Sequence, residues 1–173
     1  MKTVLVTGGS GFIGSHTCLV LLKNGFQIYV IDSFINSSAK SIEKVLEILK
    51  NIGIDAERNI KLFNIDLKNY KKVEEIFHNA YAANQSIEAV IHFAGLKSIY
   101  DSYKNPLEYY SANITSTISL LNQMRSFSVD HLIFSSSATV YGMQNSMPLT
   151  EDSKVSFPDS PYAQTKYIVE NIL

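Results

Sequence analysis

Tyr162 and Lys166 stand four residues apart at the start of a predicted helix, directly after Ser160-Pro161. A serine followed by proline is typical of a helix N-cap and first turn. Residues four apart share one face of a helix, so the Lys166 ammonium would lie beside the Tyr162 phenol. The ammonium and the positive end of the helix both favour a phenolate, which can take a proton from a hydroxyl group. The pair therefore predicts a general base, Tyr162, tuned by Lys166.

This spacing alone has little value, because Tyr100 and Lys104 match it too. We expect Tyr100 to lie in a polar connection with no strand-end hydroxyl before it, and interpret that pair as coincidental. Upstream of Tyr162, in contrast, Ser135-Ser136-Ser137 ends a predicted strand. Open α/β sheets bind ligands at the carboxyl ends of their strands. We expect Ser137 to bridge a sugar hydroxyl and Tyr162, with the other two serines serving the backbone or a cofactor.

A glycine-rich segment links the first predicted strand to the first predicted helix, with glycines at Gly8, Gly11 and Gly14. Glycines at this place permit a tight turn and let a pyrophosphate approach the backbone N–H groups at the positive end of the helix. Glycine-rich turns are common, but their position between a strand and a helix strengthens the signal. Together with Tyr162 and Ser137, the segment predicts redox chemistry on a carbohydrate hydroxyl by a bound nicotinamide dinucleotide.

Two acidic residues after predicted strands could bind the adenosine half of that dinucleotide. Asp32 follows Gly14 by 18 residues (32 − 14), near the spacing of about 20 expected for a ribose-binding acid. Its carboxylate would accept from a 2′-hydroxyl and repel a 2′-phosphate, which favours NAD over NADP. The simpler alternative is a cap in the following loop. Asp66, expected to end the third strand, could meet the adenine together with Leu67, or cap a helix beginning at Lys68.

Strand and helix patterns alternate along the chain, which predicts an α/β fold with a doubly wound parallel Rossmann sheet, strand order 3-2-1-4-5, and helices on both faces. We expect residues 1–173 to form one NAD-binding domain, with an irregular loop at 142–159. Because the chain ends at Leu173, we expect the last strand and a C-terminal substrate lobe to be missing, leaving an exposed edge beside the fifth strand. Strands are expected at 3–7, 27–31, 60–65, 89–93 and 131–135, and helices at 12–24, 39–52, 68–82, 106–127 and from 161.

Composition narrows the classes of partner. With 46% apolar residues, 18% charged residues and a formal net charge of −1, the chain is ordinary for a soluble globular protein, and neither nucleic acid nor a membrane is expected as a partner. No apolar run approaches the roughly 20 residues of a membrane helix. Cys18, the only cysteine, suits a reducing cytoplasm, where we expect the chain to reside. His16 and His92 lack zinc-ligand spacing with Cys18, so no metal site is expected.

Longer segments carry a resemblance to a known family. The chain resembles the UDP-glucose 4-epimerases, which are extended short-chain dehydrogenases/reductases, over its whole length, and covers about the first half of a family member. The most specific matches are Phe93-Ala94-Gly95-Leu96-Lys97 and the segment from Ser135 to Gly142. Further matches are Val6 through His16, Asn36-Ser37, Lys104 through Tyr110 and Ser160-Pro161-Tyr162.

The resemblance implies a tightly held NAD that is reduced and reoxidised in each turnover. Tyr162 would take the proton from the sugar 4-hydroxyl while hydride leaves C4, and the 4-keto sugar would turn over and receive hydride on its other face. Lys166 would hold the nicotinamide ribose, and Ser137 would hydrogen-bond to the reacting hydroxyl. The UDP-sugar would contact Lys97, Ser137, Thr139 and Tyr162. The implied cofactor contacts are Gly8, Gly11, Phe12, Ile13, Gly14, Asp32, Ser33, Asn36, Ser37, Asp66, Leu67, Phe93, Ala94, Gly95, Lys97, Tyr162 and Lys166.

Four positions depart from the family pattern. Ser33 replaces an asparagine beside Asp32, which alters one adenosine contact, and Ala112 replaces the first of two asparagines, which removes an amide near the cofactor. Tyr100 places a bulky side chain near the expected substrate mouth. Ala163 replaces the glycine after Tyr162, a mild change.

Several alternatives stay open. A nucleotide-sugar 4,6-dehydratase shares the Tyr/Lys pair but needs an Asp-Glu pair where this chain has Ser137-Ala138-Thr139. An epimerase of UDP-N-acetylhexosamines or UDP-glucuronate fits the same residues. An alternative of another class is a truncated, catalytically silent NAD-binding half-enzyme. A further one is a homodimer or a complementing partner chain that docks at the exposed sheet edge. We expect epimerase chemistry to be encoded here, with little or no turnover by the chain alone.

Overall fold

The computed structural model describes residues 1–142, 147–156 and 158–173. The chain divides into two compact units. Unit 1 comprises Met1–Ala94 and Ser119–Phe134, and unit 2 comprises Gly95–Ile118 and Ser135–Leu173. Each unit is described by itself.

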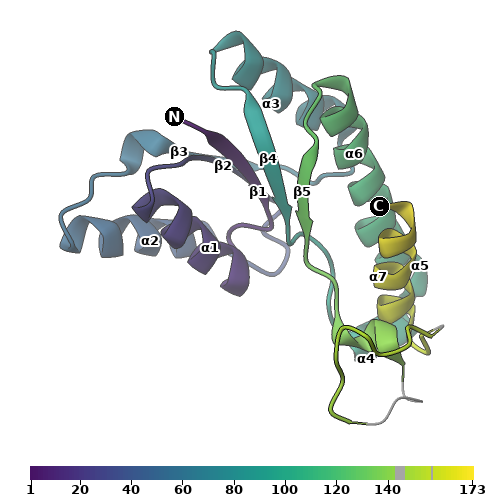
Figure 1. The fold of residues 1–173 in the computed structure, drawn as a ribbon. Helices are drawn as coiled ribbons and strands as arrows, with labels where there is room; N and C mark the ends of the chain where they lie inside the picture. Colours follow the sequence, from purple (N-terminus) through teal and green to yellow (C-terminus); the bar gives the residue numbers. More distant parts are fainter. Residues whose placement is uncertain (143–146, 157) are drawn as a thin grey trace. The chain divides into compact units, whose positions relative to one another are not determined.

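Unit 1 is built on a parallel five-stranded sheet in the order β3-β2-β1-β4-β5 (Figure 1). The predicted fold class and strand order are therefore confirmed, and the predicted strand limits hold to within two residues. Each strand is paired in parallel with its neighbours, so all carboxyl ends meet at one edge of the sheet. The strands are β1 (Thr3–Thr7), β2 (Gln27–Asp32), β3 (Ile60–Asn64), β4 (Ile87–His92) and β5 (His131–Phe134).

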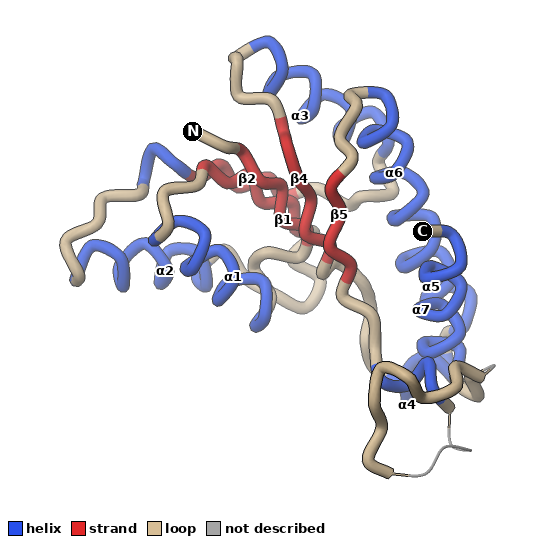
Figure 2. The backbone as a smooth tube through the Cα atoms, viewed as in Figure 1, coloured by secondary structure: helices blue, strands red, loops and turns tan. Residues whose placement is uncertain are grey.

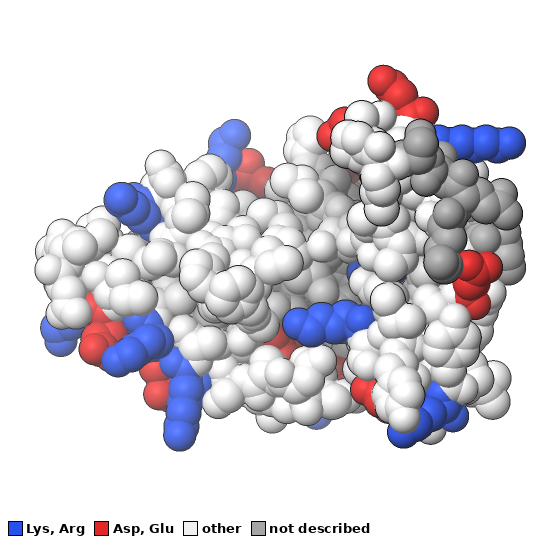
Figure 3. All heavy atoms as spheres, turned by 90° about the horizontal axis from the view of Figure 1, so that it is seen from below, with Lys and Arg blue, Asp and Glu red and all other residues white. Residues whose placement is uncertain are grey.

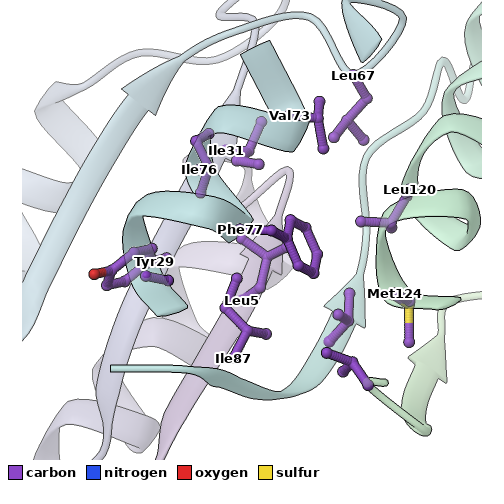
Figure 4. Close-up of a cluster of buried hydrophobic side chains, with 13 residues drawn as sticks. Leu5, Tyr29, Ile31, Leu67, Val73, Ile76, Phe77, Ile87, Leu120 and Met124 are labelled. Carbon is purple, nitrogen blue, oxygen red and sulfur yellow. The ribbon is translucent and has the colours of Figure 1, made fainter. Parts of the chain in front are cut away.

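Alternate residues of the central strands enter two hydrophobic cores, because successive side chains of a strand point to opposite faces of the sheet. Leu5 and Ile31 enter the core that contains residues of α3 (Tyr70–Ala82) and α6 (Ser116–Ser126) (Figure 4). Val6 and Val30 enter the core that contains residues of α1 (Phe12–Lys23) and α2 (Lys40–Asn51). The two helix pairs flank the strands in Figure 2. Helices on both faces explain why these strands are continuously apolar.

The first helix ends where the sequence predicts. Gly25 has φ +77°, a conformation that costs glycine little. Its N–H donates to the Leu22 carbonyl, and the Phe26 N–H donates to the Leu21 carbonyl, which is the Schellman pattern of helix termination. The turn lets β2 begin at Gln27, immediately after the helix.

The predicted sheet edge is present at β5, which lies at the end of the strand order. Ile133 is 64% exposed there. Within the part of the chain that the structure describes, β5 pairs with β4 alone. A strand with exposed apolar side chains and one unpaired side is a site where another chain can add a strand.

Two predictions about helices are wrong. The single helix expected at 106–127 is divided into α5 (Pro106–Tyr110), a π-helical turn η2 (Ser111–Thr115) and α6. The segment around Tyr100, expected to be a polar connection, forms the short helix α4 (Ile99–Lys104), capped by the Ser98 side chain, which accepts from the Asp101 N–H. The other elements of unit 2 are η3 (Ala138–Tyr141) and α7 (Pro161–Ile172).

Basic and acidic side chains of the described residues are interspersed on the face shown in Figure 3, and much of that face is uncharged. Among the described residues, no helix is long and apolar enough to cross a membrane.

Candidate active site

The glycine-rich loop lies at the carboxyl end of β1 in unit 1. Gly8 has φ +67°, and a Cβ there would lie 2.7 Å from the Ala94 backbone nitrogen, after β4. Such a separation is too short for a real Cβ contact, so only glycine fits. Gly11 is the N-cap residue of α1 and provides no side-chain hydrogen bond to the helix. The first N–H groups of α1, at Phe12 and Ile13, thus meet no side-chain cap from Gly11, an arrangement that suits an anion.

Asp32 is the last residue of β2 and is 7% exposed. Its carboxylate accepts from the Ser10 N–H at 2.9 Å, the Phe34 N–H at 3.0 Å and the Ser37 hydroxyl at 2.7 Å. Asp32 therefore does more than cap its own loop, because one of these donors belongs to the glycine loop. Ser37, predicted as a cofactor contact, holds the carboxylate in place, while the predicted neighbours Ser33 and Asn36 lie in the same loop.

Asp66, the second acidic residue, lies at a different place relative to β3 and α3 from the one predicted. Asp66 lies beyond the end of β3 at Asn64, and α3 begins at Tyr70 with Asn69 as its N-cap residue. The predictions that Asp66 ends the strand and caps a helix starting at Lys68 are both wrong. Asp66 instead accepts from the Lys68 N–H at 2.8 Å and pairs with the Lys68 ammonium at 3.5 Å. A local Asx turn of this kind competes with helix formation and delays the helix start.

Leu67 is 4% exposed and packs in the core that contains residues of α3 and α6. Its place in the core explains why residue 67 is apolar. The contacts of Asp66 and Leu67 with adenine remain predictions.

The end of β4 is fixed to β1 next to the glycine loop. The Thr7 hydroxyl lies 2.6 Å from His92 Nδ1 and accepts from the Ala94 N–H at 3.4 Å. His92 is 1% exposed, so it serves as a core histidine between two strands. Phe93 and Ala94, both predicted cofactor contacts, follow it directly and lie beside Gly8, just beyond the ends of β4 and β1.

Cys18 lies beneath the glycine loop and is fully buried. Burial raises the pKa of its thiol to about 12. Its sulfur lies 3.9 Å from the Gly9 carbonyl oxygen, which is consistent with a small packing residue. Among the described residues, no group of three or more His, Cys, Asp or Glu side chains could hold a metal ion.

Tyr162 and Lys166 lie in unit 2 on α7, which begins as predicted. Pro161 occupies the first turn, and the Ser160 side chain accepts from the Ala163 N–H at 3.1 Å. Tyr162 is 9% exposed and Lys166 is 6% exposed. The Lys166 ammonium donates to the Ser135 carbonyl at 2.8 Å, and its burial lowers the pKa of the amine from 10.5 to about 8.

The Tyr100/Lys104 pair has the same spacing as the Tyr162/Lys166 pair, but it is exposed rather than buried. Tyr100 is 69% exposed on α4, and the Lys104 ammonium lies 4.3 Å from the centre of its ring. Both pairs lie on helices, so helical position does not distinguish them. A lysine on the outer face of a tyrosine ring is a surface cation–π contact, and this supports the interpretation that Tyr100 is a coincidental match.

Ser137 follows β5 but is not part of the strand, which ends at Phe134. It is the N-cap residue of η3, a short helix that the sequence did not indicate. Its hydroxyl lies 2.8 Å from the Thr139 hydroxyl and accepts from the Thr139 N–H at 3.3 Å. The two residues predicted to contact substrate, Ser137 and Thr139, are thus paired with each other.

Asn113 is a polar residue of unit 2 whose role the sequence did not indicate. It is 4% exposed in the π-helical turn. Its Oδ1 accepts from the Leu96 N–H at 2.8 Å, and its Nδ2 donates to the Leu96 carbonyl at 3.0 Å and to the Thr165 hydroxyl at 2.9 Å. Asn113 therefore joins the segment containing Gly95 and exposed Lys97 to the helix of Tyr162. An asparagine alone carries no signal for such a contact, because its partners are distant in sequence.

The predicted residues thus fall into two groups. Unit 1 brings together the glycine loop, Asp32 with its neighbours, and Phe93 with Ala94 at one edge of its sheet. Unit 2 carries Gly95, Lys97, Ser137, Thr139, Tyr162 and Lys166.

A parallel sheet in the order 3-2-1-4-5, with a glycine-rich turn between β1 and α1, is a Rossmann fold. Within this class, the chain belongs to the family described as GDP-mannose 4,6 dehydratase, whose model matches residues 5–173.

Among curated relatives, the chain is 43% identical over 170 residues to a UDP-glucose 4-epimerase of Bacillus subtilis and 42% identical over 171 residues to UDP-glucose 4-epimerase 2 of Arabidopsis thaliana. These alignments cover 98% and 99% of the chain, and 46% of each relative. The chain thus spans about half the length of the curated relatives it matches.

Solved structures similar to this chain also include UDP-glucose 4-epimerases. A solved UDP-glucose 4-epimerase from Bifidobacterium longum, in complex with NAD+ and UDP, matches with a TM-score of 0.88 at 38% identity and covers 99% of this chain and 48% of that chain. One from Stenotrophomonas maltophila, with bound NAD and formylated UDP-arabinopyranose, matches with a TM-score of 0.86 at 36% identity, over 99% and 47% of the two chains.

Proposed function

We propose that this chain carries the NAD-binding and proton-transfer residues of a UDP-glucose 4-epimerase, which interconverts UDP-galactose and UDP-glucose through a 4-keto intermediate. The observation that carries the proposal is the buried pair on α7, with Tyr162 9% and Lys166 6% exposed in a chain whose curated relatives include UDP-glucose 4-epimerases. A buried phenol one helical turn from a buried amine is suited to proton transfer at a sugar hydroxyl.

The residues of unit 1 fit a dinucleotide. The space at Gly8 that a Cβ would fill and the N-terminus of α1 suit a pyrophosphate. The Asp32 carboxylate accepts from three donors, which leaves one lone pair of Oδ2 for a ribose hydroxyl. It would repel a 2′-phosphate, so NAD is the proposed cofactor. NAD would supply reversible hydride acceptance at the sugar C4.

The residues of unit 2 supply the proton chemistry. Tyr162 would accept the proton of the sugar 4-hydroxyl and return it after the 4-keto sugar has presented its other face. Lys166 would keep positive charge beside the phenolate, and Ser137 would hydrogen-bond to the reacting hydroxyl. Thr139 would assist by orienting the Ser137 hydroxyl, to which it is paired. Lys97, exposed after β4, would reach the phosphates or ribose.

A 4,6-dehydratase is the second candidate, because the matching family model carries that description. Elimination of water requires an additional acid. Ser137-Ala138-Thr139 offers hydroxyls and no carboxylate at the predicted place, which favours epimerisation. Epimerases of other UDP-sugars share the same chemistry and are distinguished by substrate. A homodimer or a complementing chain stays a prediction that light scattering in solution tests, and the cytoplasmic location also stays a prediction.

The test is to incubate the purified chain with NAD and UDP-galactose and to separate the nucleotide sugars by chromatography. Formation of UDP-glucose that is lost in Tyr162→Phe and retained in Tyr100→Phe supports the proposal. The second variant is a matched control, because it removes the same hydroxyl from the exposed Tyr/Lys pair. Equal loss in both variants contradicts the role proposed for Tyr162. No product from a folded preparation that retains NAD indicates that the chain carries these residues without turning over substrate by itself. A 4-keto-6-deoxy sugar product would favour the dehydratase.

A further inference from the structure

Glu170 stands one helical turn after Lys166 on α7, and both side chains reach the segment that follows β5. The Lys166 ammonium donates to the Ser135 carbonyl at 2.8 Å. The Glu170 carboxylate accepts from the Ser136 hydroxyl. Residues four apart lie on one face of a helix, so α7 holds two consecutive residues of this segment at two points. All of these residues belong to unit 2.

Ser137, the next residue, depends on this arrangement. Its hydroxyl hydrogen-bonds only with Thr139 among the residues that the structure describes, and its backbone is extended, with φ −150° and ψ 142°. In an extended segment, the position and orientation of each residue depend on the backbone of the residue before it. The direction of the Ser137 hydroxyl is therefore set on one side by η3 and on the other by the two contacts from α7.

We propose that Glu170 is a positioning residue, which acts through Ser136 to place the Ser137 hydroxyl. This inference rests on the proposed function for the role of Ser137, but it adds a residue outside the nucleotide cradle and outside the proton-transfer group. The Lys166 ammonium holds the Ser135 carbonyl, and this contact by itself leaves rotation about the bonds of Ser136 possible. The Glu170 contact removes that freedom by holding the Ser136 side chain.

A double-mutant cycle on catalysis tests the proposal. Ser136→Ala and Glu170→Ala each remove one partner, and each is expected to lower kcat about fivefold, since coupled residues in contact typically interact at this scale, with KM within twofold. The double variant is expected to be no slower than the slower single variant. Ser136→Thr, which keeps a hydroxyl, and Glu170→Gln, which keeps an acceptor oxygen, should restore most of kcat.

Asn171→Ala is the matched control, because the Asn171 side chain donates to the Tyr167 carbonyl within the same helix and does not reach the serine segment. Its kcat should equal that of the unmodified chain. Effects of Ser136→Ala and Glu170→Ala that multiply in the double variant would overturn the proposal, as would an effect confined to KM.

A spectroscopic measurement keeps this test separate from the proposed function. If the unmodified chain converts no UDP-galactose, kcat offers no comparison, and the amide resonance of Ser137 is compared among the same variants by ¹H–¹⁵N NMR. Displacement of this resonance in Glu170→Ala, with no displacement in Asn171→Ala, supports the positioning role. A Ser137 resonance unmoved by Glu170→Ala overturns it.

Discussion

The buried amine of Lys166 predicts a specific dependence of stability on pH. Lys166 is 6% exposed, and desolvation lowers its pKa from 10.5 to about 8 in the folded chain. A shift of this size corresponds to about 3 kcal/mol, at roughly 1.4 kcal/mol for each pKa unit. This value is an upper limit for the free energy that burial of the charge subtracts from folding.

The direction in which stability changes with pH follows from the protons that the folded and unfolded chains bind. Between pH 8 and pH 10.5 the folded chain has released the Lys166 proton while the unfolded chain still binds it, so the free energy of unfolding rises with pH across this window. Above pH 10.5 the amine is neutral in both states, and the cost of burial disappears. Below pH 8 the amine is charged in both states, and the full cost is present.

The assay is urea unfolding of the unmodified chain and of Lys166→Met at intervals from pH 7 to pH 11. Methionine retains much of the buried volume without a titrating group. The stability of the unmodified chain relative to the variant should increase with pH, by up to about 3 kcal/mol in total. Both the charged and the neutral amine can donate to the Ser135 carbonyl, so loss of that hydrogen bond contributes a smaller, more uniform offset.

Lys104→Met provides the control, since Lys104 is an exposed lysine of unit 2 and its charge stays in contact with water in both states. Its stability difference should stay flat within about 0.5 kcal/mol. A difference between the unmodified chain and Lys166→Met that does not change from pH 8 to pH 10.5 would refute the reasoning.

Three further predictions concern unit 1. Gly8→Ala should abolish NAD binding and destabilise the chain by about 2–3 kcal/mol, because it combines a positive φ with a Cβ placed 2.7 Å from the Ala94 nitrogen. Gly53→Ala is the control, since Gly53 has φ +81° and a Cβ there would meet no atom within 4 Å. Only the cost of the positive φ, about 1 kcal/mol, should then appear in urea unfolding. Cys18, with a pKa of about 12, should resist a thiol reagent at pH 8 in the native chain and react once urea unfolds it; rapid native-state reaction would contradict its burial. Asp32→Asn should weaken NAD binding at least tenfold and reduce the preference for NAD over NADP, both measured by calorimetry. Unchanged NAD affinity would contradict the role of the carboxylate.

The fold was predictable from the sequence because its signals are local. Apolar runs of five or six residues predicted buried parallel strands, and the Gly25 and Ser160-Pro161 signals predicted where two helices end and begin. The predictions about secondary structure were wrong where a side chain formed hydrogen bonds that the local pattern does not indicate. Asp66 bonded to its own following backbone and delayed α3, and Asn113 formed its bonds to Leu96 and Thr165 from a π-helical turn that a continuous helical pattern conceals.

The sequence by itself determined the sheet and its strand order, and it predicted which residues could bind a dinucleotide and move a proton, since these inferences depend on periodicity, glycine spacing and side-chain type. Only the tertiary structure decided which Tyr/Lys pair is buried, since Tyr162 and Tyr100 both lie on helices and differ in what packs around them. It likewise decided that Asp32 is held by the glycine loop and that Glu170 reaches Ser136. Burial and hydrogen bonds between distant segments arise when elements pack, so no spacing along the chain encodes them.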